Sequence, residues 1–466
     1  MADVSEAIFN KFLVRREVSQ TPDLATLLVA RLFYPGGSFQ AATAIVKAVL
    51  EKQLKQLSVG TELENEAFTA WLQRYLTINS TVKGTSFYPV HPVLSLSTNG
   101  ERPRVEVFIN LVAQKFTEQD QFELYKALWD ENNMPPFERV IFYLVKAQTL
   151  DPSSNLEPSF AVSGGATSNP DKVSLSTPAQ SQAVIAVIEQ TKQDLLSLAK
   201  VTVGIQAFIT HAGRLLALAL TRYLLLQAGV DLALPIYAAP AADTNEGVRA
   251  LSHEIIETHR NQFEKALRTL LKQEVEHALT SLNLLATPSD ETMAQNTVKK
   301  LFRRALTLIP KGQYAELLES YPTMADLADR YYWLEGGSSN RFLRQLHSSH
   351  LNLSKKAGIA LSRSQQSQWH FYCLSPALVE TLLLVRQAGP ETRIQVNELL
   401  KEWRARYGLA VIIDETWLGK YRQSFRSFGS PDALDEANRQ RFIEILADRG
   451  RLYKNSDDFP WVILRD

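Results

Sequence analysis

Hydrophobic residues in this chain recur mainly at intervals of three and four positions, the spacing of an amphipathic helix. In the first 150 residues the pattern covers residues 9–14, 24–33 and 41–57. Two much longer helical segments follow, at residues 182–228 and 245–286. We therefore predict a mainly α protein, organised as a multi-helix bundle with long helices.

The two long segments differ in how their apolar residues are distributed. Residues 245–286 carry one apolar stripe with charge on the other faces, which is typical of a helix on the outside of a bundle. Residues 201–226 are apolar almost all round and have the length of a membrane span, but they include His211, Arg214 and Arg222. Because charged residues are rare inside membranes, we interpret this segment as a buried central helix.

One short stretch of the N-terminal region has β character. Residues 93–97 and 105–109 are short runs with β-strand character, and they flank a turn that contains Asn99 and Gly100. Asparagine followed by glycine favours the positive backbone angles of a hairpin turn. We predict a small β-hairpin in this otherwise helical region.

Residues 151–181 interrupt the helical pattern. Serine, proline, glycine and asparagine dominate this stretch, and too little apolar surface is available to offset the entropy of ordering it. We interpret it as a flexible linker. The predicted domains are a helical N-terminal domain at 1–150, the linker at 151–181, a long-helix core at 182–370 and a C-terminal domain at 371–466.

The C-terminal domain has the element order of a winged helix-turn-helix. Helices are predicted at 376–387 and 396–407, with a short strand at 392–394 between them. A further helix begins at Ser430, whose hydroxyl caps free amides, with proline at the first helical position. Short apolar strands follow at 452–453 and 461–464. The connection at 408–429 is longer than the usual turn of this motif.

Composition restricts the function classes. Lysine plus arginine and aspartate plus glutamate both total 50, so no global field attracts nucleic acid or anionic lipid, and any nucleic-acid binding must be local. Cys373 is the single cysteine, which excludes disulfides and cysteine-ligated metal sites within the chain. The acidic, amphipathic first residues do not resemble a secretory signal. We expect a cytoplasmic protein with no membrane contact.

Signatures of catalysis are absent from the sequence. It contains no G-x-G-x-x-G, no phosphate-binding P-loop, no G-x-S-x-G and no H-E-x-x-H. His253 and His259 are six residues apart, which does not stack them on one helix face, so we expect solvated positions. His347 and His350 could share a face, and we expect a structural or phosphate-neighbour role. We predict no enzyme activity, no cofactor and no metal.

One region of the chain is basic. Residues 296–370 contain eleven lysines and arginines against five acids, and Lys299–Arg303 and Lys300–Arg304 are like-charged pairs one helical turn apart. A nucleic-acid backbone or an acidic partner would relieve that repulsion, and both alternatives stay open. The candidate contact residues are Lys299, Lys300, Arg303, Arg304, Arg341, Arg344, Lys355, Lys356 and Arg363.

The C-terminal domain is less suited to nucleic acid. The first turns of its last helix carry Asp432, Asp435 and Glu436, and the wing tip adds Asp457 and Asp458. These acids would face phosphates in the usual docking pose, so protein contact is favoured over major-groove binding. The DNA alternative stays open through four candidate contact residues: Arg422, Arg426, Arg439 and Arg441.

The helices LSPALVETLLL and ELLKEWRARYGL, together with the closing wing, resemble the C-terminal part of helical accessory proteins of bacterial phage-defence or DNA-modification systems. The resemblance covers about a fifth of the chain and implies a non-catalytic subunit that works beside a separately encoded motor or nuclease. The resulting hypothesis is an adaptor or assembly subunit with other protein subunits as partners. The alternative is a sequence-specific DNA-binding regulator that uses the winged helix.

Overall fold

The computed structural model describes part of the chain, and every structural statement below refers to that part. It comprises residues 11–12, 21–33, 77–81, 84–90, 103–132, 134–136, 138–140, 142–143, 181–202, 204–230, 236–281, 341–362, 369–413, 428–454 and 460–465. These residues are mainly helical, with few and short strands, so the predicted fold class is confirmed at that level.

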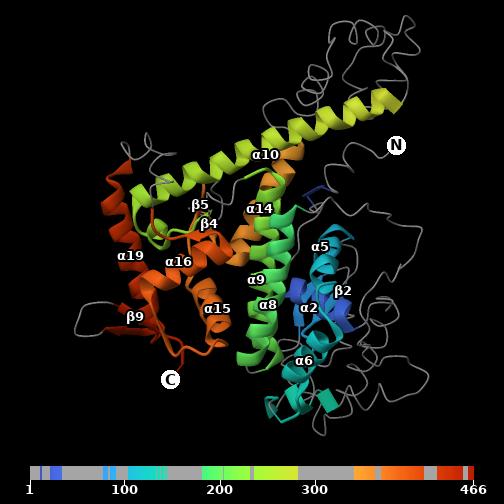
Figure 1. Ribbon diagram of the computed structural model, residues 1–466, viewed down its shortest axis with the longest axis vertical. Coiled ribbons are helices and arrows are strands. Elements are labelled where there is room, and N and C mark those ends of the chain that lie inside the picture. The colour runs from blue at the N-terminus through green and yellow to red at the C-terminus, as the bar shows by residue number, and fades with distance from the viewer. Residues whose placement is uncertain are drawn as a thin grey trace, which may run out of the picture.

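Helix α9 (Ile205–Gln227) forms the centre of the molecule (Figure 1). It packs against α2 (Thr21–Phe33), α8 (Gln182–Val201) and α14 (Arg341–Ala357). Leucines on different faces of α9, such as Leu215, Leu216 and Leu218, are all buried. The predicted buried central helix is thus confirmed, and no helix in the described residues has the length and apolar character needed to cross a membrane.

The segment predicted as one helix over 182–228 is divided at Thr202–Gly204. The backbone of Gly204 has a positive φ of 86°, which ends α8 and allows the chain to change direction before α9. The carboxylate of Glu138 accepts a hydrogen bond from the backbone amide of Ile205 at 2.9 Å and so caps the start of α9. Burial raises the pKa of Glu138, against the opposing effect of these backbone amides. The break therefore depends on a residue from the N-terminal region.

The N-terminal region packs on the two central helices. Helix α5 (Pro103–Ala113) contacts α2 and α8, and α6 (Glu118–Trp129) contacts α8 and α9. The prediction of a strand at 105–109 is wrong, because these residues belong to α5, where Phe108, Ile109 and Val112 are buried together at helical spacing. The partner strand predicted at 93–97 lies outside the described residues. An antiparallel pair occurs upstream instead, between β1 (Thr77–Thr81) and β2 (Gly84–Phe87).

Helix α10 (Glu246–Ser281) runs across one end of the molecule, at the top of Figure 1. Its first half packs on the 3-10 helix η2 (Pro240–Asp243), on α14 and on strand β5 (His370–Tyr372), which pairs with β4 (Ala360–Ser362). The long helix predicted at 245–286 is confirmed over these residues. The predicted linker at 151–181 lies outside the described residues except for Ser181, which caps the start of α8.

The C-terminal elements follow the predicted order. They are α15 (Pro376–Gln387), β6 (Arg393–Gln395), α16 (Val396–Tyr407), β7 (Leu409–Ala410), α19 (Pro431–Asp448), β8 (Leu452–Lys454) and β9 (Pro460–Ile463). Strands β6, β9 and β8 form one antiparallel sheet in that order. Strand β7 pairs in parallel with β3 (Ile236–Tyr237) of the core. One continuous hydrophobic core includes residues from the N-terminal, central and C-terminal regions.

Candidate functional site

Helix α19 presents one apolar face to the rest of the C-terminal region. Leu434, Phe442, Ile445 and Leu446 are buried, and the ring of Phe442 meets Trp403 of α16 edge-on at a centroid distance of 5.6 Å. The hydroxyl of Ser430 accepts a hydrogen bond from the amide of Ala433 at 3.3 Å, which confirms the predicted helix start. The opposite face of α19 is solvent-exposed and includes Asp432, Glu436, Arg439 and Gln440.

Two polar side chains on the flank of α19 bond other parts of the chain, one in the core and one in the C-terminal region. Asn438 is fully buried; its side-chain oxygen accepts from the amide of Ala241 at 3.2 Å, and its side-chain nitrogen donates to the hydroxyl of Tyr237 at 2.6 Å. Asp435 accepts from the amide of Ile413 at 2.6 Å, and burial raises the pKa of Asp435 to about 6. Sequence reasoning missed Asn438, because an asparagine in a mainly polar stretch gives no sign of burial.

The two described arginines of the predicted winged-helix contact set differ in their availability. Arg441 donates to Asp243 of η2 and to Glu444 of α19, both at 3.1 Å, so both of its terminal nitrogens are engaged by groups of the same chain. Arg439 is exposed. Arg422 and Arg426 lie outside the described residues, as do the wing-tip residues Asp457 and Asp458. Of the three acids predicted to face a partner, Asp432 and Glu436 are exposed and Asp435 turns toward the chain.

The basic region is described only in its C-terminal part. Lys299, Lys300, Arg303, Arg304 and Arg363 lie outside the described residues, and Arg341 is placed only as the first residue of α14. Arg344 is exposed, while Lys355 and Lys356 are half-buried in the last turn of α14. The eleven-residue separation of Arg344 and Lys355 corresponds to about three helical turns, so both lie on one side of the helix.

A cluster of histidines and one tyrosine joins α10, α14 and β5. The hydroxyl of Tyr372 lies 2.7 Å from Nδ1 of His259 and 3.1 Å from Nε2 of His350. His259 is only 4% exposed, so the prediction of a solvated position was wrong for this residue. The physical reason is tertiary, since β5 supplies a hydroxyl partner that compensates for burial of the ring.

The other histidines of this region surround the cluster. Nδ1 of His253 donates to the backbone carbonyl of His370 at 2.7 Å, and the ring of His253 stacks on Trp369 at 4.4 Å. Burial lowers the pKa of His347 to about 4 and the pKa of His350 well below its usual value. These rings are therefore neutral near pH 7. Among the described residues, no group of three or more histidine, cysteine or acidic side chains could hold a metal.

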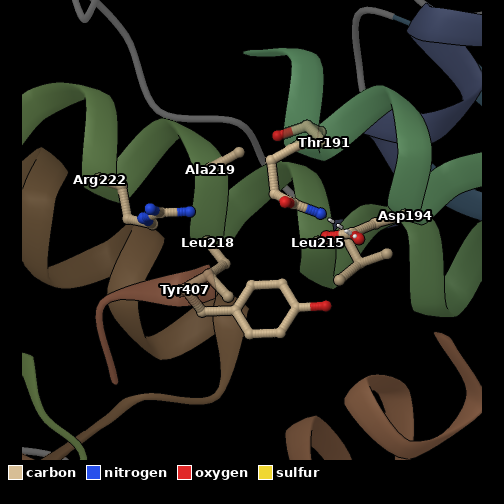
Figure 2. Close-up of a pocket in the computed structure, with 8 residues that line it drawn as sticks. Thr191, Asp194, Leu215, Leu218, Ala219, Arg222 and Tyr407 are labelled. Atoms are coloured by element: carbon tan, nitrogen blue, oxygen red, sulfur yellow. Dashed lines mark hydrogen bonds between the residues drawn. The ribbon is translucent and has the colours of Figure 1, made fainter. Parts of the chain in front are cut away.

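A small pocket lies where α8 and α9 meet the end of α16 (Figure 2). Its polar residues are Gln190, Thr191 and Asp194 from α8, Arg222 from α9 and Tyr407 from α16. Leu215, Leu218 and Ala219 form its apolar wall. Asp194 accepts a hydrogen bond from Gln190 at 2.7 Å and forms an ion pair with Arg406. Burial raises the pKa of Asp194, while the charge of Arg406 opposes that rise.

Arg222 is the unusual member of this pocket. Its side chain is only 8% exposed, and burial lowers the pKa of its guanidinium to about 10. Its Nε has no hydrogen-bond partner in the structure as described. The charge of Asp194 acts on this guanidinium and opposes the lowering of its pKa. Neither the pocket nor the burial of Arg222 could be recognised in the sequence, where Arg222 reads only as a charge inside an apolar segment.

Comparison with known proteins gives no assignment. No protein-family model, curated protein or solved structure matches this chain. Arguments about function therefore depend on the geometry of α19, the histidine cluster and the Arg222 pocket.

Proposed function

We propose that this chain is a non-catalytic adaptor or assembly subunit whose residues 371–466 form a winged helix. The support for the winged helix is the helix order α15, α16, α19 combined with the antiparallel sheet order β6-β9-β8. In this arrangement the first strand pairs with the last, and the two final strands flank a wing. Segment 414–427, which separates α16 from α19, lies outside the described residues.

The proposal rests on which side chains of α19 are exposed and which are bonded within the chain. In winged-helix proteins that read DNA, the corresponding helix offers free basic or amide side chains to the major groove. Here Asn438 and Arg441 bind Tyr237 and Asp243 within the chain. The exposed face retains Asp432 and Glu436. A partner protein with a basic surface fits this face better than a phosphate backbone does.

The basic region at residues 299–363 supplies a second contact in this proposal. Arg344 and Lys355 lie on one side of α14, where they could form one surface for an acidic partner or a nucleic-acid backbone. From the resemblance of the C-terminal helices, the proposed setting is bacterial phage defence or a related DNA transaction. The partner in that setting would be the subunit that carries the catalytic activity.

The test compares two charge-reversal variants in the full-length protein. We expect Asp432→Lys combined with Glu436→Lys to lose a partner that co-purifies at low salt from the native cells. Asp448→Lys, an exposed acid at the far end of the same helix, should retain it. Equal recovery with both variants would contradict the assignment of this face. DNA binding is measured beside it, because contact with phosphates weakens steeply as salt rises.

A DNA-binding regulator is the second candidate, and the exposure of Arg439 favours it. This alternative predicts a preferred DNA site and loss of that preference in Arg439→Ala. Equal affinity for random and selected DNA would exclude it.

A further inference from the structure

The antiparallel sheet of β6, β9 and β8 has two faces of different character. Its inner face packs on α16 and α19, and Ile394 and Val462, which point there, are buried. Because successive side chains of a strand point to opposite faces, Trp461 and Ile463 of the central strand β9 lie on the outer face. Figure 1 shows β9 at the edge of the molecule, away from α8 and α9.

The outer face is richer in apolar side chains than a solvated sheet face usually is. An antiparallel sheet with one face in water normally alternates apolar residues inward with polar residues outward. Here the outward residue of β8 is Tyr453, whose side chain is 40% exposed and lies opposite Trp461 in the register of the sheet. Trp461 and Ile463 are half-buried. An aromatic and aliphatic patch therefore reaches solvent at this face.

One cation lies across this patch. Arg393 of β6 is opposite Ile463, and its guanidinium carbon lies 4.7 Å from the ring centroid of Tyr453 on β8. The side chain therefore crosses the central strand, and it is exposed. Two neighbouring arginines, Arg451 and Arg465, donate instead to backbone carbonyls of the same chain. Among the described side chains of the sheet, Arg393 is thus the cation that is available to a partner.

Charge decides between the possible occupants of this face. No acidic residue occurs in β6, β8 or β9, so the same face of a second copy would bring no carboxylate to Arg393. Single-stranded nucleic acid needs a row of cations along its phosphates, which the described side chains of this face do not supply. A protein segment that combines a carboxylate with an apolar side chain matches both Arg393 and the patch beside it.

The size of the face limits the partner to a short segment. The longest of the three strands, β9, has four residues. Standard strand spacing and rise then give a face of roughly 10 by 13 Å. A standard interface between globular proteins covers about 800 Å² on each partner, which is several times larger. An extended segment of about four residues has the matching length.

We propose that the outer face of this sheet binds a short acidic and apolar segment of a partner protein. A carboxylate of the segment pairs with Arg393, and a neighbouring apolar side chain covers Trp461, Ile463 and the ring of Tyr453. The proposal rests on the adaptor role proposed above and adds a second protein contact to it. Because the exposed face of α19 is acidic and this face is basic, the two surfaces select different partner segments.

The test selects peptides from a phage-displayed random library on the immobilised full-length protein. We expect the enriched peptides to carry aspartate or glutamate next to an aromatic or aliphatic residue, and their fluorescein-labelled synthetic forms to bind in an anisotropy titration. Arg393→Glu should weaken this binding roughly tenfold, because repulsion replaces attraction. Lysine in place of the acidic residue of the peptide should restore binding to Arg393→Glu. Arg344→Glu, at an exposed position of α14, is the matched control and should bind like wild type.

The possible outcomes separate this surface from the adaptor role. Absence of enrichment on the wild type, or equal affinity of wild type and Arg393→Glu for the enriched peptides, would overturn the proposal. A labelled oligothymidylate is titrated in parallel, and binding that is lost in Arg393→Glu would assign the face to nucleic acid instead. Loss of the co-purifying partner in the α19 variant, together with no peptide enrichment, would keep the adaptor role and remove only this surface. If Arg393→Glu does not fold, Arg393→Ala takes its place in the titration.

Discussion

The side-chain amide of Asn438 donates to the hydroxyl of Tyr237 at 2.6 Å, although 201 residues separate them in the chain. The same side chain accepts from the amide of Ala241, so one fully buried asparagine connects α19 to both β3 and η2. This connection holds the C-terminal region against the long-helix core.

Removal of this connection should destabilise the protein. Asn438→Ala leaves the amide of Ala241 and the Tyr237 hydroxyl without their partner, at a cost of about 2 kcal/mol in the free energy of unfolding. Urea denaturation measures it. Gln440→Ala, at an exposed position of the same helix, should change stability by less than about 0.5 kcal/mol. Equal losses in both variants would refute the anchoring role of Asn438.

Two glycines provide a test of the break between α8 and α9. Gly204 and Gly229 both have positive φ, but a Cβ at Gly204 would lie 3.0 Å from Cγ of Pro135, whereas a Cβ at Gly229 would meet nothing within 4 Å. Gly229→Ala should cost about 1 kcal/mol from backbone strain alone. We expect Gly204→Ala to cost about 1 kcal/mol more, because Pro135 or Glu138 must also move. Thermal unfolding of the two variants gives the comparison.

The buried hydroxyl of Tyr372 should stabilise the histidine cluster. Tyr372→Phe removes the group between Nδ1 of His259 and Nε2 of His350 and leaves both buried ring nitrogens unsatisfied. We expect a loss of about 1–3 kcal/mol at pH 7.5, measured by urea denaturation. Tyr453→Phe, which removes a hydroxyl from an exposed ring, is the matched control and should be nearly neutral.

The same cluster should make the fold sensitive to acid. His347 titrates near its usual value of 6.5 in the unfolded chain and at about 4 in the folded protein, chiefly because it is buried. Between these values the unfolded chain binds more protons, so stability falls as the pH drops from 6.5 to 4 and is constant above 6.5 for this group. In His347→Gln the loss of unfolding free energy between pH 6.5 and pH 4 should be smaller than in the wild type by on the order of 2 kcal/mol. An unchanged slope would show that other groups carry the acid sensitivity.

Asp435 should have the opposite pH dependence. Its pKa is raised from 3.8 to about 6, so the folded protein binds the extra proton, and stability falls as the pH rises between these values. Asp435→Asn keeps an acceptor for the amide of Ile413 and removes the charge. After allowance for solvent screening at this half-buried position, it should be more stable than wild type by about 1 kcal/mol at pH 7.5. The difference between Asp435→Asn and wild type should disappear near pH 4. The control is Asp432→Asn, at an exposed position of the same helix.

Local signals predicted much of the helical framework. Helices α15 and α16 begin and end where the periodicity and the capping residues place them, and α19 starts after the Ser430 cap. A helix is defined by neighbours three and four positions away, which the sequence contains directly. Strand 105–109 was mispredicted because β-branched residues also fit a helix whose face is buried against α8 and α2.

The candidate sites were much less accessible to sequence reasoning. The burial of His259 depends on Tyr372, and the burial of Asp194 is compensated by its ion pair with Arg406. In both examples the partner lies more than 100 residues away, so no local pattern contains the information. Arg441 likewise reads as a free basic side chain until Asp243 is placed beside it.

By itself, the sequence determined the mainly helical class, the buried central helix and the order of the C-terminal elements, because each of these depends on periodicity and capping within a few turns. Only the tertiary structure decided which polar side chains became buried anchors and which remained available. That choice depends on compensating the cost of burial with a partner, and the partners of Asn438, His259 and Asp194 are set by packing between distant helices and strands.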